Sequence, residues 1–183
     1  MAHVALRSVL SSYLKRTPSE VSFIVNAWGK PSIPGGPHFS LAHSDDLAVI
    51  AVDFEHEIGV DLETGPLALS SDEMAHVLSP DELAERRERD LTAADLLRLW
   101  VRKEAVLKAL GKGVAHDPSR ITVGFPAADF ERWRPVCAVD DGVRHVFHRL
   151  DVRLGDATCA VARRDRPPPA GPIAFRNWIP PAL

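Results

Sequence analysis

The chain has 183 residues, a formal net charge of -3 and two cysteines. Its 22 basic and 25 acidic residues are spread along the chain, which excludes the one-signed surface of a nucleic-acid or anionic-membrane binder. The N-terminus has no basic segment followed by a long apolar run, and no apolar stretch reaches the ~20 residues of a membrane span. We therefore expect a cytoplasmic protein with no nucleic-acid and no membrane partner.

Cys137 and Cys159 lie among apolar residues, in no spacing typical of a metal or redox site. They are expected to be two buried thiols in a reducing compartment. A chain of this length buries about 70% of its extended surface, so it needs no disulfide to fold.

The first part of the chain predicts a helix followed by short strands. Residues 2–14 place apolar side chains on one helical face, and Thr17-Pro18 ends the pattern. Glycine and proline pairs then separate short extended segments. The expected strands are 20–25, 38–43, 47–54 and 59–63.

The second part predicts helices and then strands. One helix begins at Ser71, a second is capped by Ser79, and a third spans 93–110 and ends at Gly111. The expected strands are 120–125, 134–140, 143–151 and 157–162. The proline-rich residues 166–183 predict an extended tail.

Two parts of the chain resemble each other. A helix, the segment TPSE and a strand occur early, and a helix, DPSR and a strand occur late. Two like halves would place a ligand cleft between them, although chance similarity of two short segments remains an alternative.

In the extended segment GVDLE, Asp61 and Glu63 share one face while Val60 and Leu62 point to the core. Two neighbouring carboxylates repel each other, and a hard cation such as Mg²⁺ relieves that repulsion. The alternative is an exposed strand edge that carries two acidic residues without any ligand.

The segment WVRKEAVLKALGKG places Glu104 and Lys108 together on one edge of a helix whose apolar arc faces the core. Such an i,i+4 pair alone indicates only slight helix support. Lys103 inside the apolar arc, and the glycine loop that follows, favour a polar site where the helix meets a cleft, because a buried charge needs a partner.

Several donors suited to phosphate oxygens lie near one strand end, namely His43, Lys30 and Arg7. A structural histidine is the alternative for His43.

Taken in order, GKP, FSLAHS, GVDLE and WVRKEAVLKALGKG resemble the motifs of phosphopantetheinyl transferases of the surfactin-synthetase-activating type. The resemblance covers about residues 5 to 162. It implies an α+β fold of two similar, pseudo-duplicated halves with the active site between them. The expected boundaries are an N-terminal half at 1–56, a C-terminal half with the catalytic helix at 57–165, and a tail at 166–183.

The resemblance also implies the reaction. Phosphopantetheine moves from coenzyme A to a serine of an acyl or peptidyl carrier protein, with Mg²⁺ bound and 3′,5′-ADP released. The residues that it implies are Asp61, Glu63 and Glu104 for the metal, Glu104 as general base, Lys108 on the pyrophosphate, and Arg7, Lys30, His43 and Ser44 on the rest of coenzyme A. Glu82 matches a further acidic position at the edge of the active site.

The chain departs from the family pattern in two ways. Relatives carry a longer segment before the first helix, and Ala42 stands where they often have serine. Either the start of the chain is misplaced or shortened, or the chain is a compact variant with a more open adenosine pocket and exposed strand edges. We expect a monomer, with self-association through the exposed N-terminal edge as the alternative. The alternatives to an active transferase are a binding module without turnover and a different Mg²⁺-dependent phosphoester enzyme.

Overall fold

The computed structural model describes residues 2–66, 70–125, 130, 132–167, 174 and 176. Within them the fold is α+β with antiparallel sheets, as the sequence predicts. The elements are α1 (Ala2–Leu14), β1 (Ile24–Val25), β2 (Pro31–Ser32), β3 (His38–Ser44), β4 (Leu47–Asp53), β5 (Ile58–Glu63), α2 (Ser71–Val77), α3 (Pro80–Glu88), α4 (Ala93–Leu110), β6 (Ile121–Thr122), β7 (Arg134–Asp140), β8 (Val143–Leu154) and β9 (Ala157–Arg164).

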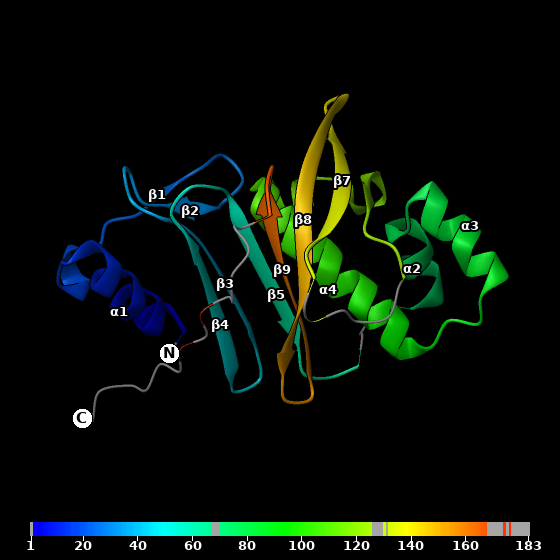
Figure 1. The fold of residues 1–183 in the computed structure, drawn as a ribbon, viewed down its shortest axis with the longest axis horizontal. Coiled ribbons are helices and arrows are strands. Elements are labelled where there is room, and N and C mark those ends of the chain that lie inside the picture. The colour runs from blue at the N-terminus through cyan, green and yellow to red at the C-terminus, as the bar shows by residue number, and fades with distance from the viewer. Residues whose placement is uncertain are drawn as a thin grey trace.

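A five-stranded sheet with the order β5-β9-β8-β7-β6 forms the centre of the molecule. The helix α4 covers one face of it, and the β3–β4 hairpin packs against the other face at β5 and β9 (Figure 1). The outer face of that hairpin packs against α1. The strand β5 therefore lies where the hairpin, the sheet and α4 meet.

The alternation of residues in β5 explains its place. Val60 and Leu62 are 0% and 1% exposed, as their apolar side chains predict, and they pack with Ala42 of β3. A direct hydrogen bond joins the hairpin to β5, since the backbone N–H of Val60 donates to Ser40 Oγ at 3.1 Å. The hairpin thus contacts β5 through a buried serine as well as through apolar packing.

Two strands are shorter than the sequence predicts. The expected strand 20–25 is reduced to Ile24–Val25, because Pro18–Glu20 forms a 3-10 turn with Thr17 as its cap. The expected strand 120–125 is reduced to Ile121–Thr122. The backbone N–H groups of Val123 and Gly124 donate instead to the Glu82 carboxylate, at 2.8 and 3.0 Å. Among the described residues they therefore make no hydrogen bonds to a neighbouring strand.

The echo between the two parts of the chain has a structural counterpart. Pro18–Glu20 forms a 3-10 turn after α1, and Pro118–Arg120 forms another after α4. The division at residues 56 and 165 stays a prediction. Most of the proline-rich tail, at 168–173, 175 and 177–183, lies outside the described residues.

The prediction for the cysteines is right for one thiol and wrong for the other. Both are free, and Cys159 is buried, which raises the pKa of its thiol to about 12. Cys137 is half-buried, on the sheet face that α4 does not cover, and its sulfur accepts a hydrogen bond from Arg144 Nη2 at 2.9 Å. Because Cys137 is only half-buried, its thiol keeps contact with water.

Candidate active site

The helix α4 crosses β5 at Gly59, and the two backbones nearly touch there. A Cβ atom on Gly59 would lie 2.0 Å from the Ala105 carbonyl oxygen and 2.4 Å from the Ala109 nitrogen. A side chain at this position would push the helix away from the strand, so glycine is required by space. The close crossing brings one face of the last turns of α4 over Asp61.

Lys108 and Asp61 form an ion pair at that crossing. The Lys108 Nζ lies 2.6 Å from Asp61 Oδ1, with the lysine side chain 31% exposed and the aspartate 9% exposed. The second oxygen, Asp61 Oδ2, is buried and has no hydrogen-bond partner in the described structure. A buried carboxylate oxygen without a donor is costly, so this atom faces a place where a cation or a donor would be stabilised.

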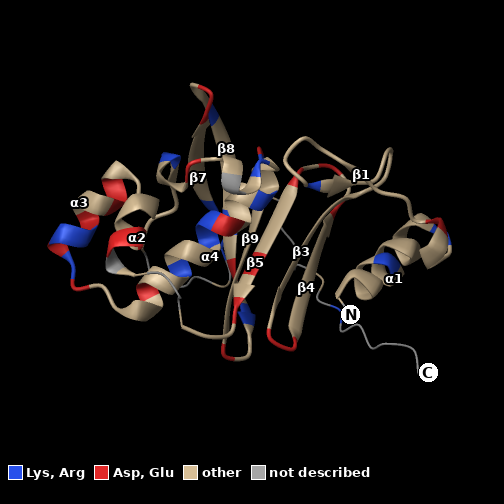
Figure 2. Ribbon diagram, turned by 180° about the vertical axis from the view of Figure 1, so that it is seen from behind, with Lys and Arg blue, Asp and Glu red and all other residues tan. Residues whose placement is uncertain are grey.

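The Glu104 carboxyl lies one helical turn before Lys108. Burial, and then the negative charge of Asp61, raise the pKa of Glu104 to about 6, and Glu63 adds to the effect. Burial also raises the pKa of Asp61, although the Lys108 ammonium works in the opposite direction. Three acidic side chains from β5 and α4, those of Asp61, Glu63 and Glu104, therefore lie close enough to repel one another, as the sequence predicts. In Figure 2 the acidic positions of β5 lie beside the charged stretch of α4.

The tip of the β3–β4 hairpin lies against the end of β5. Ser44 Oγ donates to Glu63 Oε2 at 3.1 Å, and the backbone N–H of Thr64 donates to Ser44 Oγ at 3.2 Å. Glu63 is thereby held by a residue of the preceding hairpin. A cavity of about 390 Å³ borders this end of the strand, lined by Leu47, Thr64, Leu154, Gly155, Asp156 and Ala157.

The carboxylates suit a hard cation but are not assembled as a finished metal site. Among residues 2–66, 70–125 and 132–167, no three His, Cys, Asp or Glu side chains are arranged to hold a metal ion. Lys108 occupies the position beside Asp61 Oδ1 instead. The unpartnered Asp61 Oδ2 and the raised pKa of Glu104 are the features that a divalent cation would relieve, since oxygen ligands with excess negative charge are what Mg²⁺ prefers.

Lys30 lies at the opposite end of β5, at the C-terminus of α4. Its ammonium pairs with Glu57 and donates to the Ala109 carbonyl at 3.2 Å. Glu57 also lies 3.2 Å from His38 Nδ1. The lysine side chain is 17% exposed, so its ammonium is engaged by protein groups and reaches a ligand only by exchanging Glu57 for it.

Arg7 and His43 are placed differently from the carboxylates. Arg7, on α1, donates to the Val21 carbonyl and lies with its guanidinium carbon 4.9 Å from the Phe23 ring centre. Its described contacts tie α1 to the segment that follows it. His43 is exposed on β3, next to Ser44. The structure thus brings Ser44, Asp61, Glu63, Glu104 and Lys108 together, and it gives Arg7 and Lys30 contacts of their own.

The positions of Lys103 and Glu82 correct two expectations. Lys103 Nζ lies 2.7 Å from Glu82 Oε2, and their side chains are 0% and 1% exposed. Glu82 also accepts from the backbone of Ser79, at the start of α3. Both residues therefore belong to the core that joins α3 and α4, and neither faces a cleft.

Sequence reasoning missed Glu57 and Thr64. Glu57 neutralises Lys30, and Thr64 completes the hydrogen bonds around Ser44. Both residues directly flank β5, so their position next to the GVDLE motif could have marked them as candidates. Their partners come from other elements, and no pattern in the sequence indicates those pairings.

Comparison with known proteins agrees with this architecture. The family described as the 4'-phosphopantetheinyl transferase superfamily matches residues 57–162, which is more than half of the chain. That range runs from just before β5 through α4 to β9, so it contains the crossing described above. The chain therefore belongs to the 4'-phosphopantetheinyl transferase superfamily.

Individual relatives carry the same name. The chain is 36% identical over 127 residues to 4'-phosphopantetheinyl transferase HetI of Nostoc sp.. The aligned region covers 60% of this chain and 50% of that protein. It is 27% identical over 164 residues to 4'-phosphopantetheinyl transferase Sfp of Bacillus subtilis, covering 79% of this chain and 70% of the relative. The chain thus spans about half the length of the first of these relatives.

Proposed function

We propose that this chain transfers the 4'-phosphopantetheine group of coenzyme A to a serine of an acyl or peptidyl carrier protein, releasing 3′,5′-ADP. Family membership supports the class of reaction. The observation that carries the proposal is the crossing of α4 and β5, where Lys108, Asp61 and Glu104 lie together beside an unpartnered carboxylate oxygen. A lysine next to buried carboxylates is suited to a phosphate group held with a divalent cation.

In this proposal Asp61, Glu63 and Glu104 would hold Mg²⁺, which when bound would supply positive charge to neutralise the pyrophosphate of coenzyme A. Lys108 contacts a phosphate oxygen and stabilises the charge that develops on the leaving group. Its side chain is 31% exposed, so the ammonium is accessible to a ligand from solvent while it pairs with Asp61.

The chain's own groups then move one proton. The carrier serine Oγ attacks the phosphorus on the pantetheine side, its O–H bond breaks, and the proton passes to the Glu104 carboxylate. The bond between that phosphorus and the 3′,5′-ADP oxygen breaks, and the electron pair leaves with 3′,5′-ADP. Even in the metal-free protein, where burial and Asp61 raise the pKa of Glu104 to about 6, its carboxylate is ionised at neutral pH and can accept that proton.

Arg7, Lys30, His43 and Ser44 are proposed contacts of the adenosine and 3′-phosphate part of coenzyme A. Trp28, two residues before Lys30 along the chain, lines a second cavity of about 420 Å³. The other lining residues are Lys112, Ala115, His116, Asp117, Arg120, Asp140 and Asp141. The cytoplasmic location, the monomeric state and self-association through the N-terminal edge remain predictions. Among the described residues no helix is long and apolar enough to cross a bilayer.

The test is incubation of the purified protein with coenzyme A, Mg²⁺ and an apo carrier protein, followed by intact-mass measurement of the carrier. Carriers of fatty acid, polyketide and nonribosomal peptide synthesis are assayed side by side. A covalent mass increase that disappears with chelator, and with Asp61→Ala or Glu104→Ala, supports the proposal. Binding of a carrier with no mass increase indicates a binding module, and coenzyme A hydrolysis without a carrier indicates a different phosphoester enzyme.

A further inference from the structure

A buried arginine anchors α4 to the central sheet two residues before Glu104. Arg102 is 0% exposed, and its Nε and Nη2 atoms donate to the two oxygens of Asp151 on β8, at 2.8 and 2.6 Å. Its Nη1 donates to the Gly124 carbonyl at 3.1 Å. The guanidinium is therefore held in one plane by a fork of bonds to the sheet and by a third bond to the loop after β6.

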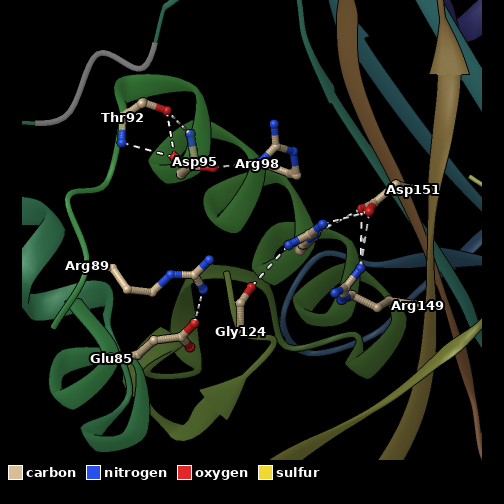
Figure 3. A network of polar contacts seen from close by, with 9 residues as sticks. Glu85, Arg89, Thr92, Asp95, Arg98, Gly124, Arg149 and Asp151 are labelled. Carbon is tan, nitrogen blue, oxygen red and sulfur yellow. Dashed lines mark hydrogen bonds and ion pairs between the residues drawn. The ribbon is translucent and has the colours of Figure 1, made fainter. Parts of the chain in front are cut away.

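A second arginine, Arg149, reaches the same aspartate from β8 itself. Its Nη1 lies 3.3 Å from Asp151 Oδ2, and its Nε donates to the Val123 carbonyl at 3.3 Å. Figure 3 shows Arg149 and Asp151 pointing toward one another, and Gly124 on the other side of the arginine guanidinium that lies between Gly124 and Asp151. Arg102 and Arg149 thus share one acidic partner, but only Arg102 belongs to α4.

We propose that Arg102 is a positioning residue, which fixes the rotation of α4 about its axis and so sets Glu104 and Lys108 against β5. The inference rests on the proposed function. Apolar packing of α4 on the sheet is not directional, whereas a two-bond arginine–carboxylate pair is. A rotation of about 15° moves an atom on the surface of a helix by roughly 1.5 Å, and displacements of about 1 Å in an active site cost up to ~100-fold in rate.

The triad offers a matched pair of substitutions, Arg102→Met and Arg149→Met. Each removes one buried guanidinium of the same size, and each leaves the other arginine opposite Asp151, so both variants keep a balanced ion pair and are expected to fold. Only Arg102→Met removes the directional bonds between α4 and β8. We expect kcat for carrier modification to fall at least about tenfold in Arg102→Met, with KM for coenzyme A changed less than about threefold, and to stay within about twofold in Arg149→Met.

Thermal unfolding of both variants is measured first, and kinetics are compared at a temperature where each is fully folded. Arg102→Lys is a third variant, because a lysine keeps the charge but cannot make the two-bond fork, and it is expected to remain impaired. An unchanged kcat in folded Arg102→Met overturns the proposal. So does a fall in kcat that is the same in both methionine variants for the same loss of thermal stability.

A readout independent of turnover separates this inference from the proposed function. Mn²⁺ binding is followed by electron paramagnetic resonance, with the metal added alone. We expect weaker Mn²⁺ binding in Arg102→Met than in Arg149→Met, because a rotated helix carries Glu104 away from Asp61. Equal binding in the two variants counts against Arg102, whereas wild-type protein that binds Mn²⁺ but modifies no carrier counts against the proposed function alone.

Discussion

At the scale of single residues, Glu104 is the side chain whose protonation the fold changes most clearly within the candidate site. Its pKa is raised to about 6 from an ordinary value of 4.5 by burial and by the carboxylate of Asp61. Between these two values the folded protein binds more protons than the unfolded chain. The free energy of unfolding therefore falls as pH rises through that window.

This predicts that Glu104→Gln stabilises the metal-free protein at pH 7.5, by about 1 kcal/mol, and removes the part of the decline in stability between pH 4.5 and 6 that Glu104 causes. Urea unfolding with chelator present, repeated at several pH values, measures it. Glu88→Gln, on an exposed glutamate of α3, is the control and should leave the slope as in wild type. Parallel curves for Glu104→Gln and wild type would contradict the electrostatic account.

Mg²⁺ binding should stabilise the wild type more than Glu104→Gln, which is the opposite of the order expected without metal. Mg²⁺ that relieves the repulsion among the carboxylates raises the thermal unfolding midpoint of the wild type. At ten times its Kd it adds about 1.4 kcal/mol to the free energy of unfolding. Asp61→Asn and Glu104→Gln should show much smaller shifts, which differential scanning fluorimetry with and without Mg²⁺ detects. Equal shifts in all three proteins would place the cation elsewhere.

At the scale of elements, the crossing of β5 and α4 depends on a residue with no side chain. Gly59→Ala places a Cβ within 2.0 Å of a backbone oxygen that cannot rotate away. We expect a loss of at least about 2 kcal/mol in unfolding free energy, and a drop in transfer rate because Lys108 moves away from Asp61. Gly65→Ala is the control, since nothing lies within 4 Å of a Cβ there. Similar unfolding midpoints for the two variants would show that the crossing is looser than described.

The contact between α3 and α4 makes a second prediction. Lys103→Met leaves the Glu82 carboxylate buried without its cation, and such a loss costs about 3–5 kcal/mol. Arg89→Met, which breaks the exposed Arg89–Glu85 pair of α3, should cost less than about 1 kcal/mol. Urea unfolding compares the two, and a small cost for Lys103→Met would mean that water reaches Glu82.

At the scale of the whole molecule, the packed cores differ in size. The core between α4 and the central sheet holds 17 buried residues among those described, whereas the core under α1 holds five. The larger core supports the candidate site directly. The smaller core joins α1 to the β3–β4 hairpin, so it is expected to open more easily.

Leu10→Ala and Leu99→Ala test this difference, because both side chains are 0% exposed but lie in different cores. We expect Leu99→Ala to lower the global unfolding free energy by about 2–5 kcal/mol. Leu10→Ala should instead mainly accelerate hydrogen exchange in α1, leaving the amides of α4 protected. Hydrogen exchange with mass spectrometry measures both, and equal loss of protection in α4 would mean one cooperative unit.

The order of elements and the composition of the site could be predicted from the sequence. Alternation in GVDLE placed Val60 and Leu62 in the core, and the motif of α4 indicated Glu104 and Lys108, because strand and helix periodicities are local properties of the chain. Caps at Ser79 and the left-handed Gly111 followed from the same local rules.

The pairing of charges that lie far apart along the chain was decided by the tertiary structure alone. The sequence predicted that Lys103 faces a cleft, but in the structure it pairs with Glu82 of α3. The Asp151 that binds Arg102 lies 49 positions away along the chain. Likewise Lys30 pairs with Glu57. The predicted strand 120–125 is shortened because the backbone N–H of Val123 donates to the Glu82 carboxylate. Local patterns set which residues carry charge and on which face they lie, but a charge is neutralised by whichever element the fold brings beside it.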